Sequence, residues 1–250
     1  MSKPEPTTPD PQYNWTPGAD PKTEKEIEEF FNSREIEELK VLMCDIGRRM
    51  WQKNYVDGNG GNLTIRVGDD LVLCTPTLIS KGFMKPEDMC LVNLEGEQLA
   101  GTLKRTGEVL THIGIMKLQP NAKACCHAHP PLATGFAIAA VTPERCLTPE
   151  GEVFIGEIGI ADFRWPGSPE CAKVVGESGI DHVAIFMSNH GVITRAKHIE
   201  MAYWRLENLE TVCSNHLITK QIMGNAAIPK IDGEDADKLF ANHKTISETM

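Results

Sequence analysis

The stretch Ala122–Pro131 reads AKACCHAHPP and contains the residues from which the rest of the interpretation follows. Ala122–His129 is predicted to form a strand, and the two prolines after it are tolerated in the first turn of a helix. Side chains alternate across a strand, so His127 and His129 should point to the same face. Their backbones would lie about 6–7 Å apart, which lets both imidazoles reach one metal ion. On these residues alone, a metal site and a hydrogen-bonded histidine pair are both open.

A third histidine favours the metal site. His190 directly follows the apolar run His182–Met187, in a turn that ends with Gly191. This predicts an imidazole at the end of a rigid, buried strand. Three histidines with an open coordination position are typical of catalytic rather than structural zinc. Such a site polarises a carbonyl group and stabilises a developing enolate.

Glu108 is the candidate acidic partner of these histidines. It lies near the start of a helix predicted over Thr106–Leu118, just before the histidine strand. A carboxylate beside a metal can be a ligand, or it can move protons when substrate displaces it. Acidic residues are also favoured in first helical turns by the helix dipole. The residues alone leave both interpretations open.

Three loops carry groups that together suit an anion. Gly58–Asn62 (GNGGN) precedes a strand and can form a nest of backbone N–H groups. Thr75–Thr77 and Ser80-Lys81 supply hydroxyls and one positive charge, and Thr106-Gly107 supplies N–H groups at a helix start. Each of these segments by itself is also an ordinary loop.

Patterning outside these motifs indicates one α/β domain. Strands and helices alternate irregularly, with an early hairpin, which predicts a mixed or antiparallel sheet covered by helices. The predicted elements are an amphipathic helix with its apolar stripe from Ile36 to Met50, strands at Asn62–Val67, Leu71–Cys74, Met89–Leu94, Glu152–Ile155 and Gly159–Phe163, a helix from Ser168 to Glu177, and a long helix from Lys197 to Met223.

Composition excludes several classes of protein. The chain has 250 residues, 41% of them hydrophobic and 24% charged, as in globular proteins. A net charge of −10 argues against nucleic-acid binding. No apolar run approaches the roughly 18 residues that span a bilayer, and the start lacks a secretory signal, so we expect a cytoplasmic protein without membrane contact. Its eight scattered cysteines should be buried thiols.

The two ends differ from the middle of the chain. Residues 1–33 form a proline-rich extension, predicted to be disordered as far as residue 23 and then to contain a short acidic helix. Residues 231–250 are predicted to be a polar tail. Helical extensions with proline-rich linkers resemble tags that load enzymes into bacterial microcompartments, and a disordered tail is the alternative. Either way, residues 1–33 should be dispensable for catalysis, because the candidate site residues lie beyond residue 57.

The order of the motifs GGN-LTIR, TPT, TGEVLTH, QPNAKACCHAHPP and SNHGVI resembles the class II aldolase/adducin family. L-Fuculose-1-phosphate aldolases and L-ribulose-5-phosphate 4-epimerases belong to this family, and the resemblance covers residues 34–230. It implies a single domain with a central, largely antiparallel sheet flanked by helices. It also implies a fourfold homotetramer with active sites between neighbouring subunits.

The resemblance also implies roles for individual residues. His127, His129 and His190 match the zinc ligands, and Glu108 matches the catalytic glutamate that binds the resting metal and shuttles the proton. Epimerases usually carry aspartate there, which favours carbon–carbon cleavage. The phosphate-binding positions fall on Asn62, Thr77, Thr106 and Gly107.

The chain departs from the family pattern at three places. Leu78 stands where the family often has glycine, and Thr106-Gly107 replaces a common pair of serines. No tyrosine lies between residues 56 and 202, although the aldolases use one as proton donor. The acids Glu150, Glu152 and Glu157 lie in that region without an assignable role.

Taken together, the sequence predicts a zinc-dependent aldolase acting on a small deoxyketose 1-phosphate, as in fucose or rhamnose breakdown. Its products would be dihydroxyacetone phosphate and an aldehyde such as lactaldehyde. The alternatives are an epimerase, dehydratase or decarboxylase with the same fold, or a non-catalytic adducin-like binding protein. Another divalent metal could replace zinc.

Overall fold

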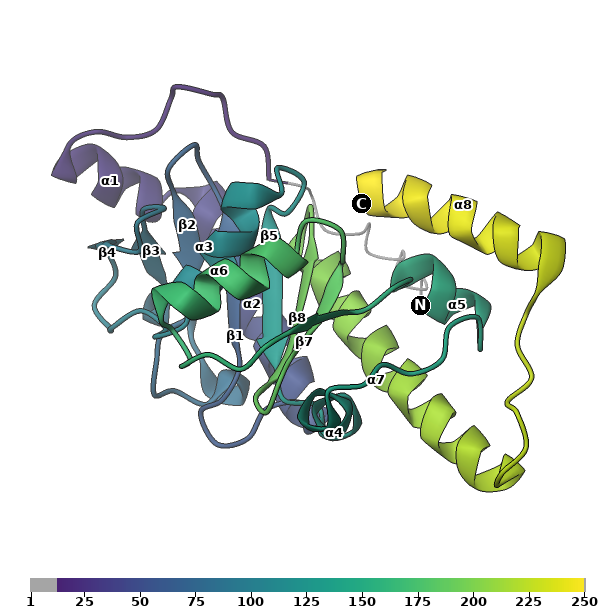
Figure 1. Ribbon diagram of the computed structural model, residues 1–250. Coiled ribbons are helices and arrows are strands. Elements are labelled where there is room, and N and C mark those ends of the chain that lie inside the picture. Colours follow the sequence, from purple (N-terminus) through teal and green to yellow (C-terminus); the bar gives the residue numbers. More distant parts are fainter. Residues whose placement is uncertain (1–12, 250) are drawn as a thin grey trace, which may run out of the picture.

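The first histidine of the motif lies on β5 (Ala124–Ala128), near the middle of the sheet. The computed structural model of the protein describes residues 13–249, and within them eight strands form one sheet in the order β4-β3-β2-β1-β5-β8-β7-β6 (Figure 1). Neighbouring strands are antiparallel except β6 and β7. The predicted single α/β domain with a largely antiparallel sheet is therefore confirmed. The other strands are β1 (Asn62–Arg66), β2 (Val72–Cys74), β3 (Cys90–Val92), β4 (Gln98–Ala100), β6 (Gly159–Ala161), β7 (Ala184–Met187) and β8 (Gly191–Ala196).

Helices cover both faces of this sheet. α2, α4 and α7 share a core with one face, and α3 and α6 pack together on the other. The long helix predicted to end at Met223 is α7. The helices are α1 (Glu24–Phe31), α2 (Arg34–Gln52), α3 (Val109–Leu118), α4 (Pro131–Ala139), α5 (Pro149–Phe154), α6 (Pro169–Ser178), α7 (Ile199–Met223) and α8 (Gly233–Thr249), with 3-10 turns η1 (Lys81–Phe83) and η2 (Pro86–Asp88).

Alternation along β5 decides which layer each side chain enters. Cys126 belongs to the core beneath α2 and α7, whereas Cys125 belongs to the core beneath α3 and α6. His127 lies two residues after Cys125, so its side chain projects toward α3. All eight cysteines are free and buried, as the sequence predicted.

The predicted strand Glu152–Ile155 is wrong, because these residues belong to α5 and its C-terminal boundary. The Thr148 side chain accepts a hydrogen bond from Gly151 N at 3.1 Å, and Pro149 occupies the first helical turn. These start signals outweigh the strand preference of a short apolar run. The strands β4 and β8 were not predicted.

The segment before α1 is ordered by hydrogen bonds with the β1–β2 turn. This differs from the disordered lead-in that was predicted for residues 13–23. The Trp15 indole N–H donates to Asp69 Oδ1 at 2.8 Å, and its ring packs beside Lys123. Asp20 accepts the backbone N–H groups of Asp69 and Asp70 at 3.0 and 2.7 Å. The predicted short acidic helix is α1, and the microcompartment tag stays a prediction. Residues 1–12 lie outside the described part.

The C-terminal segment is folded as well, where a polar tail was predicted. α8 lies alongside α5, away from the sheet (Figure 1). Ile231 N donates to Cys146 O at 2.9 Å, and His243 Nδ1 donates to Val153 O at 3.0 Å. Within residues 13–249, no helix is long and apolar enough to cross a membrane.

Phe31 at the end of α1 gives a test of whether the N-terminal extension contributes to stability. Its side chain is 6% exposed, and Lys40 Nζ lies 3.5 Å from its ring centroid. Phe31→Ala should lower the free energy of unfolding by about 3 kcal/mol, because a buried ring leaves a cavity. Urea unfolding measures this loss. The control Val41→Ala removes an exposed side chain from α2 and should change the free energy by less than about 0.5 kcal/mol. Equal effects of both substitutions would contradict a packed extension.

Candidate metal centre

Strand pairing brings the predicted residues together at one end of the central strands. Asn62 on β1 is the register partner of His127 on β5, so both side chains lie on the α3 face. His190 lies in the tight turn between β7 and β8, and β8 is the other neighbour of β5. His129 follows the last residue of β5, where His129 N donates to Tyr55 O at 2.8 Å. The sheet therefore positions three imidazoles that are distant in sequence.

The three imidazoles converge on one point. Their ring centroids are 4.8 to 5.2 Å apart, and potential ligand nitrogens of all three lie within 4.8 Å of one another. His127 is 1% exposed, and His190 and His129 are 15% and 20% exposed. The site is therefore enclosed on the sheet side and reachable from solvent on the other. Three imidazole nitrogens at this spacing can coordinate one metal ion.

Hydrogen bonds orient two of the rings toward this point. His127 Nδ1 donates to Val192 O at 2.9 Å, because a carbonyl oxygen can only accept. His129 Nδ1 lies 2.7 Å from Asp57 Oδ1, and we assign the proton to the nitrogen. The Nε2 atoms of both rings, 3.2 Å apart, then carry lone pairs. Sequence reasoning missed Asp57, whose only signal is its place at the start of the GNGGN loop.

Glu108 completes the cluster from the N-terminal boundary of α3. Its Oε2 lies 3.4 Å from His127 Nε2 and accepts a 2.9 Å hydrogen bond from Asn62 Nδ2. Its Oε1 lies 3.4 Å from His190 Nε2 and, among the described residues, has no hydrogen-bond partner. A buried carboxylate oxygen without a donor is costly. It is also a free ligand atom facing the histidines.

A divalent cation fits this donor set. Burial, together with the neighbouring imidazoles, holds the pKa of His127 well below its usual range, and burial lowers the pKa of His190. Both rings are thus neutral at physiological pH and offer lone pairs. A cation would also satisfy Glu108 Oε1. Imidazole nitrogens with one carboxylate suit zinc and other first-row metals.

His112 lies behind the cluster and was missed by sequence reasoning. It is fully buried, and its Nδ1 lies 2.9 Å from Thr64 Oγ1 on β1. Burial and the nearby His127 lower the pKa of His112 to about 3, so it stays neutral. Its spacing of four residues from Glu108 places both on one side of α3, which is the signal that could have found it.

The predicted anion-binding segments also meet here. Thr77 N donates to Lys104 O at 2.9 Å and Thr106 N donates to Thr75 O at 3.0 Å, so the loops of residues 75–80 and 104–108 are joined. Asn62 links the GNGGN loop to Glu108. Gly107 is exposed, and the space around it is open. The loops that carry the four predicted phosphate-binding residues therefore form one connected surface, in which Asn62 and Thr106 are buried and the N–H groups of Thr77 and Thr106 already have partners.

Leu78 at this surface has a φ of 60° and is 80% exposed. That backbone conformation favours glycine, which explains why the family often has glycine at this position. A left-handed leucine costs on the order of 1 kcal/mol, so the loop stores strain beside the candidate site.

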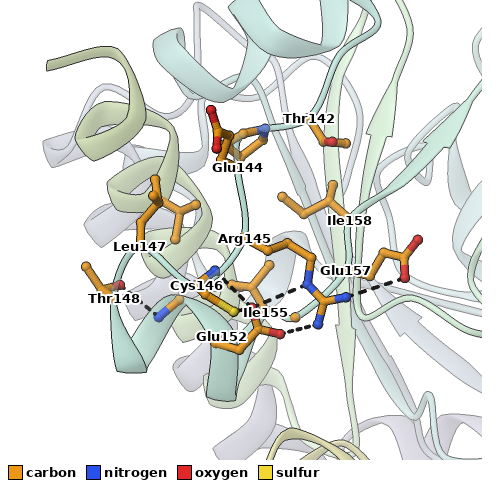
Figure 2. Close-up of a pocket in the computed structure, with 14 residues that line it drawn as sticks. Thr142, Glu144, Arg145, Cys146, Leu147, Thr148, Glu152, Ile155, Glu157 and Ile158 are labelled. Carbon is orange, nitrogen blue, oxygen red and sulfur yellow. Dashed lines mark hydrogen bonds and ion pairs between the residues drawn. The ribbon is translucent and has the colours of Figure 1, made fainter. Parts of the chain in front are cut away.

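Two of the three acids that lacked a role are ion-paired elsewhere. Arg145 reaches Glu152, which is 2% exposed, and Glu157 at 3.7 Å. Figure 2 shows the Arg145 guanidinium pointing between them at a cavity of about 220 Å³. This cavity is lined by residues 142–148, 151–152 and 155–158 and by Val212, and by none of the histidines. Glu152 and Glu157 are therefore unsuited to donate a proton at the metal centre of the same chain.

The sequence profile of the Class II Aldolase and Adducin N-terminal domain matches residues 41–217. The chain belongs to the class II aldolase and adducin family. It is 35% identical over 177 residues to a Methanococcus maripaludis protein named L-fuculose phosphate aldolase, covering 71% of this chain and 95% of that protein. Class II aldolases use a divalent metal, with which the three-histidine cluster is compatible.

Two other relatives broaden the comparison. A Haemophilus influenzae protein named 3-oxo-tetronate 4-phosphate decarboxylase is 30% identical over 175 residues, or 68% of this chain and 83% of that protein. The crystal structure of Escherichia coli YgbL superposes with a TM-score of 0.74 at 25% identity, covering 82% of this chain and 98% of YgbL. The family thus includes both aldolases and decarboxylases among its named members.

The hydrogen bond from His129 to Asp57 can be tested by metal affinity. Asp57→Asn should weaken Zn²⁺ binding by roughly 10- to 100-fold, because a carboxylate partner fixes the ring and raises ligand basicity. Chelator competition measures the dissociation constant. His129→Ala should weaken binding further, because it removes a ligand atom. Asp45→Asn, which alters an exposed acid on α2 paired with Arg49, is the control and should bind normally. Wild-type affinity in Asp57→Asn would contradict this role.

Proposed function

We propose that this family member is a zinc-dependent carbon–carbon lyase that cleaves a small deoxyketose 1-phosphate. The products would be dihydroxyacetone phosphate and an aldehyde such as lactaldehyde. The observation that carries the proposal is Glu108, whose unpartnered Oε1 faces His190 and whose Oε2 faces His127. The named aldolase at 35% identity supports the same reaction.

We assign the zinc ligands to His127, His129 and His190, with Glu108 as the fourth, displaceable ligand. A divalent metal held there polarises a carbonyl group of the substrate and stabilises the negative charge that develops beside it. In cleavage, the new carbanion takes up one proton at carbon, and Glu108 is the group we assign to deliver it. The Asn62 amide donates to Glu108 Oε2 and so leaves Oε1 as the atom that moves the proton.

We assign the substrate phosphate to the surface bordered by Asn62, Thr77, Thr106 and Gly107. Exposed backbone at a glycine lets a ligand approach closely, and N–H groups at the start of α3 favour an anion. The names of both relatives include a phosphate. These observations support a phosphorylated substrate of few carbon atoms.

A decarboxylase is the second candidate, because one relative bears that name and because the chain lacks a donor tyrosine between residues 56 and 202. A group that donates a proton in aldol addition acts as a base in the reverse reaction. Retro-aldol cleavage needs such a base to remove the proton from the substrate hydroxyl group that becomes the aldehyde. Loss of carbon dioxide from a 3-oxo acid needs no such base, yet it leaves a similar carbanion for Glu108 to protonate. The metal-free, adducin-like alternative is less well supported, because all four candidate ligands are present.

Homotetrameric assembly in the cytoplasm, without nucleic acid or membrane partners, completes the proposal. Large apolar side chains support an assembly: Trp165 is 78% exposed and Ile222 is 77% exposed. A neighbouring subunit could then supply the missing base.

An assay of the purified protein distinguishes the aldolase from the decarboxylase. The protein is incubated with a panel of ketose 1-phosphates and 3-oxo acid phosphates. Release of dihydroxyacetone phosphate from a ketose 1-phosphate is expected, and release of carbon dioxide alone would favour the decarboxylase. Absence of both, with zinc bound, would overturn the proposal.

Glu108→Gln tests the proton-transfer role. Turnover should fall by roughly two to four orders of magnitude, because a positioned acid–base group is lost. Most zinc should remain, because three histidines still hold it. Metal analysis beside the cleavage rate measures both quantities. Glu95→Gln, an exposed acid paired with Lys117, is the control. Near-normal turnover with full zinc in Glu108→Gln would refute the role.

A further inference from the structure

Lys81 is a buried cation next to the candidate site. Its side chain is 1% exposed, and Nζ donates to Asn59 O at 2.9 Å and to Ile79 O at 2.7 Å. Among residues 13–249, no carboxylate lies within ion-pair distance of this Nζ. An ammonium has three donors, so two carbonyl groups account for only part of its capacity.

A buried charge without an ion-pair partner needs an explanation. Removing an ammonium from water costs several kcal/mol, which partners usually offset. Lys40 illustrates the ordinary solution: it is also 1% exposed, but it pairs with Glu37 at 2.5 Å and packs over the Phe31 ring. Burial lowers the pKa of Lys81 to about 8, so the group is still mostly charged at neutral pH. The charge of Glu108 opposes this lowering of the pKa, so Lys81 keeps a positive charge whose counter-charge lies beyond ion-pair distance, in the metal centre.

The position of Lys81 connects the candidate anion-binding loops. Asn59 belongs to the GNGGN loop and Ile79 to the loop of residues 75–80, so one ammonium ties the two together. Gly60 N donates to Asp57 O at 2.7 Å and closes the first loop. The second loop is in turn joined to residues 104–108 by backbone hydrogen bonds. We call these three segments the three-loop surface.

The backbone at Lys81 is held in place by α2. A Cβ atom added to Gly47 would lie 2.5 Å from Lys81 O. The helix thus packs directly against this peptide, and only glycine allows the approach. The ammonium is consequently a fixed charge, because its peptide is held by α2 and its Nζ by two carbonyl groups.

We propose that Lys81 is the fixed positive charge that makes the three-loop surface selective for a phosphate group. It does so from behind the loops, as a positioning residue, and not by direct contact. This inference rests on the proposed function and names one determinant of its substrate class. A phosphate dianion on the outer side supplies a negative charge in addition to that of Glu108, which belongs to the metal centre, and low surrounding polarity strengthens that attraction.

Substitution tests the inference on the zinc-loaded, full-length protein. Lys81→Met should weaken the binding of inorganic phosphate, measured by isothermal titration calorimetry, by at least roughly tenfold. Lys81→Arg should restore part of the affinity, because it keeps the charge. Lys40→Met removes an equally buried lysine remote from the site and should bind phosphate as wild type does. Zinc content should not change in any of them. Phosphate affinity within twofold of wild type in Lys81→Met would overturn the inference.

A second measurement needs no substitution that could unfold the chain. In wild-type protein with lysine side chains labelled with ¹⁵N, added phosphate should shift the Lys81 Nζ resonance and leave that of Lys40 unchanged. An unshifted Lys81 resonance at saturating phosphate would also overturn the inference.

Catalysis separates this inference from the proposed function. If wild-type protein cleaves phosphorylated and unphosphorylated forms of a substrate equally well, the phosphate class in the proposed function is wrong, and the inference about Lys81 falls with it. If wild type prefers the phosphorylated form and Lys81→Met keeps the same preference in kcat/KM, only the role of Lys81 is refuted.

Discussion

The antiparallel pairing of β5 with β1 and β8 fixes the geometry on which the candidate site depends. The β1–β5 register places Asn62 opposite His127, and the β5–β8 pairing brings the turn that carries His190 beside the end of β5. A slip of one residue would turn His127 into the core beneath α2 and α7. Because both faces of β5 are buried, such a slip would exchange the side chains that pack in the two cores, so the packing energy of the cores also holds the metal ligands in place.

Charge organisation is the second constraint. Two carboxylates, Glu108 and Asp57, face the imidazoles, and the buried ammonium of Lys81 lies behind the neighbouring loops. A divalent metal and a phosphate dianion together would add no net charge to this arrangement, and each would lie beside groups of the opposite sign. Among the described residues, some buried groups such as Glu108 Oε1 lack a hydrogen-bond partner, and Glu108 Oε1 lies where a bound ligand can supply one.

The segments at both ends act through packing rather than chemistry. Residues 13–33 dock on the β1–β2 turn and on α2, and α8 packs against α5. Arg145 is held between acids at the cavity beneath that helix pair, so this region is organised independently of the histidines. The metal centre lies at the ends of central strands, while α5 and α8 lie side by side away from the sheet (Figure 1).

The sequence by itself determined the strand with His127, the acid at the start of α3 and the class of fold, because period-two alternation and helix-start signals are local. It did not reveal the roles of Asp57 and His112, or that Lys81 is buried without an ion-pair partner, because burial and hydrogen-bond partners come from residues far apart in the chain. Composition likewise suggested disorder for residues 13–23, whereas hydrogen bonds with the β1–β2 turn and the cations Arg66 and Lys123 beside Trp15 order them. Only tertiary structure could decide these points, since the free energy of each group depends on neighbours that the fold brings within a few ångströms.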